Sequence, residues 1–273
     1  MWHARLIRAG QPVHRDLMVG LLAACVLSVS PLHANESAQA LIERAIDLTR
    51  SQGSIATIRM HVHRPDWERT SRLVAWTRGR EDALIRFTAP ARDAGNATLK
   101  RGADMWTFAP RVNRVIRLPA SLMSQSWAGS DFSYNDLARS DELLVHYTLA
   151  LVAAELAAAE PAPAGATAAA RVYTIDATPR PSAPVVWGRQ QLRVRDDGVI
   201  VEATWFDQDG AAVKRLQALT VAALGGRTFA THTRMSDLTR PDHYTEVRYE
   251  DVQFDQVLGD EAFTQFALRN SGQ

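Results

Sequence analysis

Two histidines, His61 and His63, stand two residues apart in a stretch where polar and apolar residues alternate. In a strand, positions i and i+2 point to the same face, so both imidazoles could reach one metal ion. The sequence offers no obvious third ligand, and a solvated strand face shared with Arg59 explains the pair equally well. The pattern alone is a weak indication of a metal site, and we expect no bound metal.

Other residues that could carry chemistry are better explained as turns. Ser130 stands beside Asp131, but adjacency in sequence is no sign of a catalytic triad, and a capping or turn role is expected. The segments 196–198 (Asp-Asp-Gly) and 207–210 (Asp-Gln-Asp-Gly) resemble fragments of calcium loops and suit hairpin turns. HExxH, GxSxG, P-loop and Rossmann motifs are absent from the sequence. We therefore expect no enzymatic activity and no cofactor.

The composition is that of an ordinary globular protein. The chain has 273 residues, of which 46% are apolar and 22% charged. Lys and Arg number 31 against 30 for Asp and Glu, so bulk charge indicates neither a nucleic-acid partner nor an anionic membrane surface.

The N-terminus has the pattern of an export signal. Three arginines precede an apolar run at 17–29 that is too short for an ordinary membrane span, and Ala34 provides a small residue for cleavage. We predict a signal peptide over 1–34 and one domain over 35–273.

Leu22-Ala23-Ala24-Cys25 leaves open a lipoprotein signal with a lipidated Cys25; an uncleaved anchor is disfavoured by the length of the run. Cys25 is the only cysteine, so cleavage at Ala34 leaves no disulfide to stabilise the domain.

The elements that must position these residues follow from hydrophobic periodicity. Residues 36–50 have helical spacing, and period-two alternation with tight turns then predicts short strands up to 118. A similar set follows from 171 to 252, and 260–266 has the pattern of a short helix. For 141–170 propensity favours a helix and a linker, while the neighbouring meander favours a long strand, which we prefer.

Roughly ten or eleven antiparallel strands result, with one apolar face. Their natural arrangement is a single strongly curved sheet covered by a helix, a mainly β (α+β) fold that packs solid or encloses a ligand.

Residues 126–137 interrupt this β pattern with two aromatics, a glycine and helix-capping residues. Tryptophans recur elsewhere, mostly in strands, where core packing is the ordinary explanation for each. A curved sheet lined by aromatics beneath such an insert would also suit an apolar ligand.

Three segments carry a family resemblance: 95–110, which includes Leu99-Lys100 and Asp104-Met105-Trp106; 114–117 (Arg-Val-Ile-Arg); and 126–137, with its Ser-Trp-x-Gly-Ser-Asp-Phe pattern. They resemble the outer membrane lipoprotein-sorting protein family, relatives of the periplasmic lipoprotein carrier LolA. The match extends over nearly all of 35–273 and is poorest at 149–170.

The resemblance implies an unclosed antiparallel β-barrel with a helical lid over a hydrophobic cavity. It implies a monomeric periplasmic carrier that binds acyl chains of lipids or lipoproteins, for outer membrane lipoprotein sorting or for lipid export with an inner-membrane transporter of RND or ABC type. An alternative of the same fold is a periplasmic envelope-stress sensor that binds a partner protein, and a hydrolase or metalloprotein is a third hypothesis.

Strand alternation and the insert supply the ligand-binding candidates. The lid candidates are Trp127 and Phe132, with Gly129 giving the insert freedom to move. The cavity-wall candidates are Ile85, Phe87, Trp106, Phe108 and Trp205.

Overall fold

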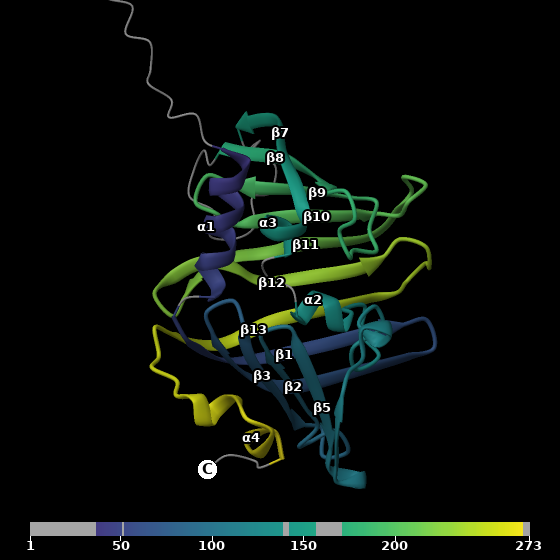
Figure 1. The fold of residues 1–273 in the computed structure, drawn as a ribbon, viewed down its shortest axis with the longest axis vertical. Coiled ribbons are helices and arrows are strands. Elements are labelled where there is room, and N and C mark those ends of the chain that lie inside the picture. The colour runs from purple at the N-terminus through teal and green to yellow at the C-terminus, as the bar shows by residue number, and fades with distance from the viewer. Residues whose placement is uncertain (1–36, 51, 139–141, 157–170, 270–273) are drawn as a thin grey trace, which may run out of the picture. The chain divides into compact units, whose positions relative to one another are not determined.

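The computed structural model describes residues 37–50, 52–138, 142–156 and 171–269 (Figure 1). The predicted signal peptide, Cys25 and most of the Ala-rich segment lie outside these residues, so those predictions stay predictions.

Helix α1 (Ala38–Arg50) follows the predicted spacing. Leu41 and Ile42 are fully buried, and Ala38, Ala45 and Ile46 share their face. The Ser37 hydroxyl accepts a hydrogen bond from the Ala40 N–H at 3.1 Å and caps the first turn. One apolar stripe thus fixes this helix against the sheet.

Within the described residues, thirteen strands form a single antiparallel sheet, more than the ten or eleven predicted. Their bounds are β1 Ser54–Arg64, β2 Trp67–Arg78, β3 Asp82–Ala89, β4 Ala97–Arg101, β5 Asp104–Ala109, β6 Arg114–Arg117, β7 Tyr147–Leu156, β8 Arg171–Pro179, β9 Arg189–Arg195, β10 Ile200–Phe206, β11 Ala212–Leu224, β12 Arg227–Asp237 and β13 Tyr244–Phe254.

Two meanders join at the centre of this sheet. The order is β6-β5-β4-β3-β2-β1-β13-β12-β11-β10-β9-β8-β7, so β1 pairs with β13 and each meander runs outward from that pair. The edge strands β6 and β7 are consecutive in sequence, and residues 118–146 connect them. The sheet is an unclosed β-barrel, as the resemblance implied, and the central insert links its two free edges.

The two faces of the sheet are covered by different helices. On the inner face, defined by Ile58, Met60 and Val62 of β1, lie α1, α2 (Tyr134–Ala138) and α3 (Glu142–His146), which form the helical lid (Figure 1). On the outer face, defined by Arg59, His61 and His63, the 3₁₀ helix η3 (Asp260–Phe263) and α4 (Gln265–Arg269) cover β3 to β5.

Two local expectations need adjustment. The strand favoured within 141–170 exists as β7, but the short helix α3 precedes it. The last of the short strands expected before 118 was predicted over 111–118 and instead begins at Arg114, because Pro110–Val112 form a 3₁₀ turn that ends on the left-handed Asn113.

Candidate functional site

An apolar cavity of about 350 Å³ lies between the inner face and the lid. This volume is in the range of small-molecule sites, about 300 to 1,000 Å³. Strands β1, β2, β3, β11, β12 and β13 supply its walls, and α1 and the insert close it. Its principal apolar lining residues are Leu48, Ala56, Ile58, Met60, Leu73, Ala75, Ile85, Trp127, Phe132, Leu137, Leu216, Phe229, Val247, Tyr249 and Val252.

A few polar groups meet this apolar surface. Arg50, at the end of α1, and Asp136 of α2 are among the lining residues. Burial raises the pKa of the Tyr249 phenol, and the positive charge of Arg50 opposes that shift without cancelling it. Tyr249 is therefore neutral at neutral pH, and the wall it forms suits an uncharged ligand surface.

The centre of the insert is a tight turn. Ala128 and Gly129 both have left-handed backbones, with φ of 52° and 70°, and the Ser130 N–H donates to the Trp127 carbonyl at 2.9 Å. Two consecutive positive φ values are the pattern of a type I′ turn, which places Gly129 where a side chain would be strained. The turn geometry explains why a glycine stands at position 129. The freedom of movement that we expected Gly129 to give the insert stays a prediction.

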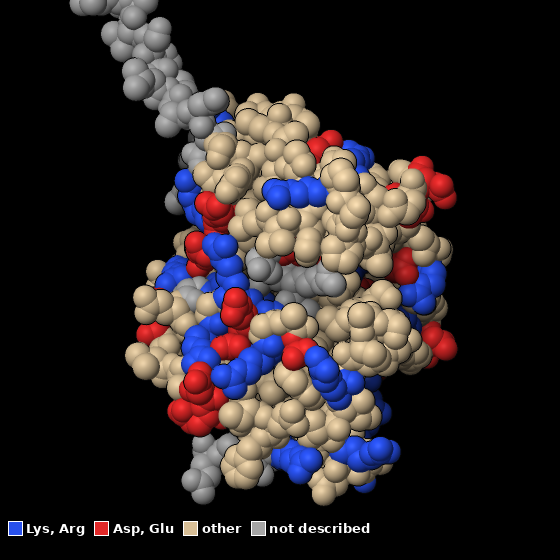
Figure 2. Space-filling model, in the orientation of Figure 1, with Lys and Arg blue, Asp and Glu red and all other residues tan. Residues whose placement is uncertain are grey.

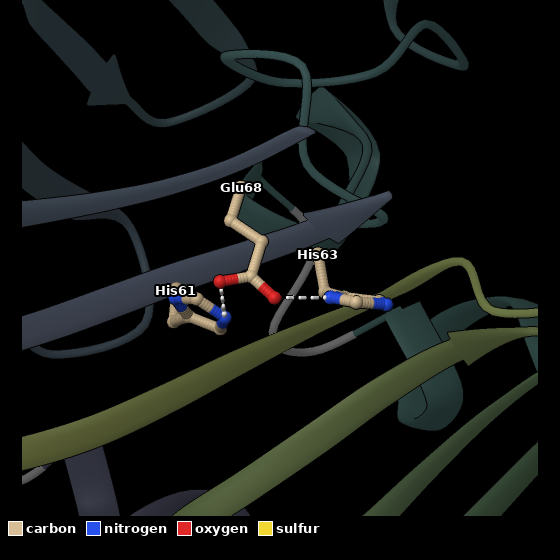
Figure 3. Close-up of side chains that lie close together, drawn as sticks. All are labelled: His61, His63 and Glu68. Carbon is tan, nitrogen blue, oxygen red and sulfur yellow. Dashed lines mark hydrogen bonds and ion pairs between the residues drawn. The ribbon is translucent and has the colours of Figure 1, made fainter. Parts of the chain in front are cut away.

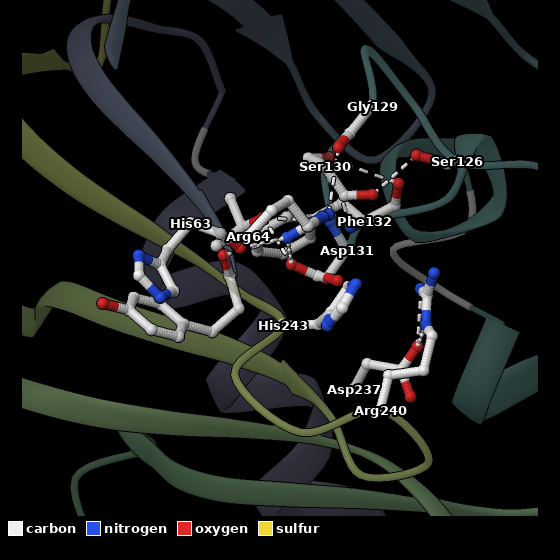
Figure 4. A network of polar contacts seen from close by, with 12 residues as sticks. His63, Arg64, Ser126, Gly129, Ser130, Asp131, Phe132, Asp237, Arg240 and His243 are labelled. Carbon is white, nitrogen blue, oxygen red and sulfur yellow. Dashed lines mark hydrogen bonds and ion pairs between the residues drawn. The ribbon is translucent and has the colours of Figure 1, made fainter. Parts of the chain in front are cut away.

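A buried ion pair fastens this turn to the sheet (Figure 4). The Arg64 guanidinium donates to Asp131 Oδ2 and to the Gly129 carbonyl, each at 3.0 Å. Thr245 of β13 donates its hydroxyl to the same carboxylate at 2.7 Å, and Arg69 of β2 donates to the Ala128 carbonyl. The Arg64 and Asp131 side chains are only 9% and 3% exposed, so strands β1, β2 and β13 together hold the lid turn.

A second polar contact fixes the part of the lid that follows. Ser133 and Asp136 exchange capping hydrogen bonds at the start of α2, with Ser133 N–H donating to Asp136 Oδ2 at 2.6 Å. The same carboxylate pairs with Lys214 of β11, whose ammonium also lies over the Trp205 ring. The lid is thereby tied to both meanders.

Three of the predicted ligand-binding residues line the cavity: Ile85, Trp127 and Phe132. Trp127 is 5% exposed, and its indole N–H donates to Thr98 Oγ1 at 3.0 Å. Phe87 packs against Trp127 with ring centroids 5.4 Å apart and lines a neighbouring pocket of about 300 Å³.

The other predicted wall residues lie elsewhere. Trp106 and Phe108 pack on the outer face against Phe263 and Leu268, because the C-terminal helices cover β3 to β5 there; Phe108 also borders the smaller pocket. Trp205 packs with the α1 cluster on the inner face and is absent from the residues that line the larger cavity. The wall residues that the sequence reasoning missed, such as Met60, Leu216 and Phe229, come largely from β1 and the second meander.

The features suggestive of catalysis have structural partners. Ser130 is 2% exposed, and its hydroxyl donates to the Trp127 carbonyl at 2.7 Å. Asp197 pairs with Arg195, and Asp207 accepts hydrogen bonds from the N–H groups of Asp209 and Ala211 within its own turn. These contacts explain the turn and capping roles expected from the sequence.

A second, more polar opening of about 690 Å³ lies near the β6 edge. Charged residues share its border with apolar ones, among them Lys100 of β4, Asp104 of β5 and Glu142 of α3. Acidic and basic side chains are also interspersed over the lid side of the surface (Figure 2). The apolar cavity, rather than this opening, is therefore the candidate ligand site.

Known structures share this arrangement. A DUF1329 family protein from Desulfovibrio piger has 24% sequence identity and a TM-score of 0.73, covering 85% of this chain and 97% of its own. A LolA superfamily protein from Nitrosomonas europaea has 22% identity and a TM-score of 0.67, with 85% and 99% covered. A domain provisionally described as an outer membrane lipoprotein-sorting protein, from Vibrio parahaemolyticus, has 19% identity and a TM-score of 0.71, with 86% and 100% covered.

The curved open sheet, the lid and the cavity define a LolA-like fold. A family model described as "-like: Uncharacterized protein" matches residues 79–270, more than half of the chain, and the protein belongs to the family that this model describes. No functionally curated protein matches the sequence. Within the described residues, no helix is long and apolar enough to cross a membrane.

Proposed function

We propose that this protein is a periplasmic carrier that holds acyl chains of lipids or lipoproteins beneath its lid. The observation that supports this most directly is the apolar cavity of about 350 Å³ between the inner face and residues 127–137. Transfer of acyl chains from water into such a cavity is favourable by about 0.8 kcal/mol per CH₂ group, before the cost of association. The function is binding and transport, and it requires no reaction and no cofactor.

Such a carrier needs a donor and an acceptor. We propose that it works as a monomer with an inner-membrane transporter, in outer membrane lipoprotein sorting or in lipid export. The fold shared with LolA superfamily structures supports the periplasmic location, together with the predicted signal peptide over 1–34. Fractionation of cells that express the full chain should place the processed protein in the periplasm.

The binding proposal is tested with the purified protein and a fluorescent fatty-acid probe. Ile85→Trp adds an indole to the cavity wall. Because the indole fills part of the cavity, the affinity for the probe should fall by about tenfold or more. Val152→Trp, at a 53% exposed position on β7, is the matched control and should bind as the parent does. Extraction of the purified protein should also yield bound lipid by mass spectrometry.

The proposal fails if no lipid co-purifies and the probe does not bind. It also fails if Ile85→Trp and Val152→Trp bind the probe equally while both remain folded by circular dichroism.

A further inference from the structure

The outer face of the β1–β2 hairpin brings together three side chains of the metal-ligating type. These are His61 and His63 of β1 and Glu68 of β2, and one ligand atom from each lies within 4.8 Å of the other two (Figure 3). The histidine spacing is visible in the sequence, whereas the carboxylate is contributed by the neighbouring strand. The cluster faces away from the cavity, so the acyl-binding proposal does not involve it.

The hairpin register explains why these residues meet. His63 is paired directly with Glu68, His61 is paired with Thr70, and no register shift interrupts this strand pair. Residues two apart on one strand share a face, and a cross-strand partner lies beside them. Strand β1 has β13 on its other side, so the backbone of His61 and His63 is held from both sides, whereas β2 pairs with β3 only from Arg72 onward and Glu68 stands on a strand segment paired with β1 alone.

The distances suit a shared ion. Glu68 Oε1 lies 2.7 Å from His63 Nδ1, and Glu68 Oε2 lies 3.9 Å from His61 Nε2, so the carboxylate stands between the two imidazoles. Ligand atoms of a tetrahedral zinc ion, with bonds of about 2.0 to 2.1 Å, are separated by about 3.3 Å. The two observed distances, measured to different carboxylate oxygens, lie on either side of that value. With one ligand atom taken from each residue, all separations are within 4.8 Å, so the side chains must adjust for one ion to contact all three.

Neighbouring groups orient both imidazoles. His61 Nδ1 lies 3.0 Å from Thr70 Oγ1, which turns its Nε2 toward Glu68. The His63 ring stacks on Tyr244 with centroids 4.5 Å apart and planes 20° from parallel. Contacts of this kind fix the orientation of metal-binding histidines.

The partial exposure of the three side chains gives a cation access to them. The side chains of His61, His63 and Glu68 are 29%, 24% and 59% exposed, which leaves an approach for the ion and a position for water. Arg59 and Arg72, on the same face, both pair with Glu250, so one carboxylate offsets part of their positive charge.

We propose that His61, His63 and Glu68 form a three-ligand site for a divalent transition-metal ion of the zinc class, with solvent completing the coordination. Two imidazoles and one carboxylate suit Zn²⁺, whereas Ca²⁺ and Mg²⁺ prefer sites made of oxygen ligands. The site would clip β1 to β2 immediately before Arg64, the residue that holds the lid turn.

The test is a titration of the chelator-treated, tag-free protein with ZnCl₂ by isothermal calorimetry. We expect one ion per chain with micromolar or tighter affinity, no competition by Mg²⁺, and a rise in Tm with Zn²⁺. His61→Ala, His63→Ala and Glu68→Gln should each weaken binding by about tenfold or more. His243→Ala is the matched control, because that imidazole contacts the Pro241 carbonyl and lies outside the cluster.

The variants change partly exposed side chains, and circular dichroism in the presence of chelator establishes that each is folded. If a variant is not folded, the corresponding His→Gln substitution replaces it. Absence of Zn²⁺ binding by the parent protein at millimolar concentration overturns the proposal. Equal affinity of the parent and all three ligand variants, or loss of binding in His243→Ala alone, also overturns it by placing the ion elsewhere.

Discussion

The inner and outer faces of strand β1 share one backbone and differ in what they bury. Ile58, Met60 and Val62 point inward and are almost inaccessible, whereas Arg59, His61 and His63 point outward and retain contact with solvent. Ile58 and Met60 line an apolar cavity, and side chains of the outer face pair with charged neighbours on β2 and β13. A single alternating stretch can therefore serve two unrelated kinds of site.

Ion pairs show the same contrast. Arg64–Asp131 is nearly inaccessible and holds the lid turn, while Arg59 in the Arg59–Glu250 pair is 58% exposed and connects two strands already joined by backbone hydrogen bonds. Removing one partner of a buried pair costs more than removing one partner of an exposed pair, because it leaves an uncompensated charge away from water. On the inner face, we therefore expect the charged side chains that hold the lid to contribute most to the free energy of unfolding.

The largest effect should come from breaking the buried pair. Asp131→Ala leaves the Arg64 guanidinium without its carboxylate in a buried position, which should cost about 3 to 5 kcal/mol of unfolding free energy. Arg59→Ala, the matched change on the outer face, should cost less than about 1 kcal/mol. Urea unfolding of both variants measures this, and equal losses would remove the distinction between the faces.

The apolar cluster around Phe263 on the outer face should contribute to stability without contributing to ligand affinity. Phe263 is fully buried against Leu84 and Leu99 on the face opposite the cavity. Phe263→Ala should cost about 3 to 5 kcal/mol of unfolding free energy through the space it leaves. The affinity of the folded fraction for the fatty-acid probe should stay unchanged, and a parallel loss of affinity would show that this cluster belongs to the binding site.

Phe132 should show the opposite behaviour. It is half-buried and lines the cavity. Phe132→Ala should therefore lower the affinity for the fatty-acid probe by about tenfold, or about 1.4 kcal/mol of binding free energy, with a smaller loss of unfolding free energy. Phe266→Ala, at a 75% exposed ring on α4, is the control and should change neither quantity. Trp127→Ala is less informative because Trp127 is also core, so a loss of stability would accompany any loss of binding. A pure stability loss in Phe132→Ala would exclude it from the ligand surface.

The smallest effect should be a pH dependence of the outer ion pairs. The hydrogen bond from Arg59, opposed by burial and assisted by Arg72, lowers the pKa of Glu250 below its ordinary value of 4.5. A lowered folded-state pKa stabilises the fold above the unfolded value, and that contribution disappears as pH falls through the folded one. Glu250→Gln should therefore lose up to about 1 kcal/mol at pH 7, with the difference vanishing in acid. A difference that persists in acid would assign the loss to packing.

Much of the fold was predictable from alternation and turn residues. The helix at 38–50, the meanders and the Asp-Gly hairpin turns all follow from local patterns, and the resemblance implied the open barrel and its lid. For 141–170 propensity favoured a helix and the neighbouring meander a strand; the structure has both, because the short helix α3 packs beside α1 and β7 before the strand begins.

The candidate site was only partly predictable, for a geometric reason. Alternation divides β5 into two faces but does not say which one is covered by α4, so Trp106 was assigned to the wrong side of the sheet. The Arg64–Asp131 pair joins residues far apart in sequence and has no local pattern. Glu68 was within reach of sequence reasoning: a two-residue turn at Pro65-Asp66 places residue 63 opposite residue 68.

The pairing of β1 with β13 has a consequence for how the chain acquires its structure. Ser54 is paired with Phe254, so the middle of the sheet cannot form until almost the entire polypeptide is available. Each meander can assemble from neighbouring hairpins, but each exposes an unpaired edge strand and half of an apolar surface until the other arrives. Sheets whose paired strands are far apart in sequence fold slowly. The entropy of closing the long intervening loop is lost before the contacts between the strands stabilise the fold. The chain is consequently most vulnerable to aggregation and proteolysis before its last long strand is in place.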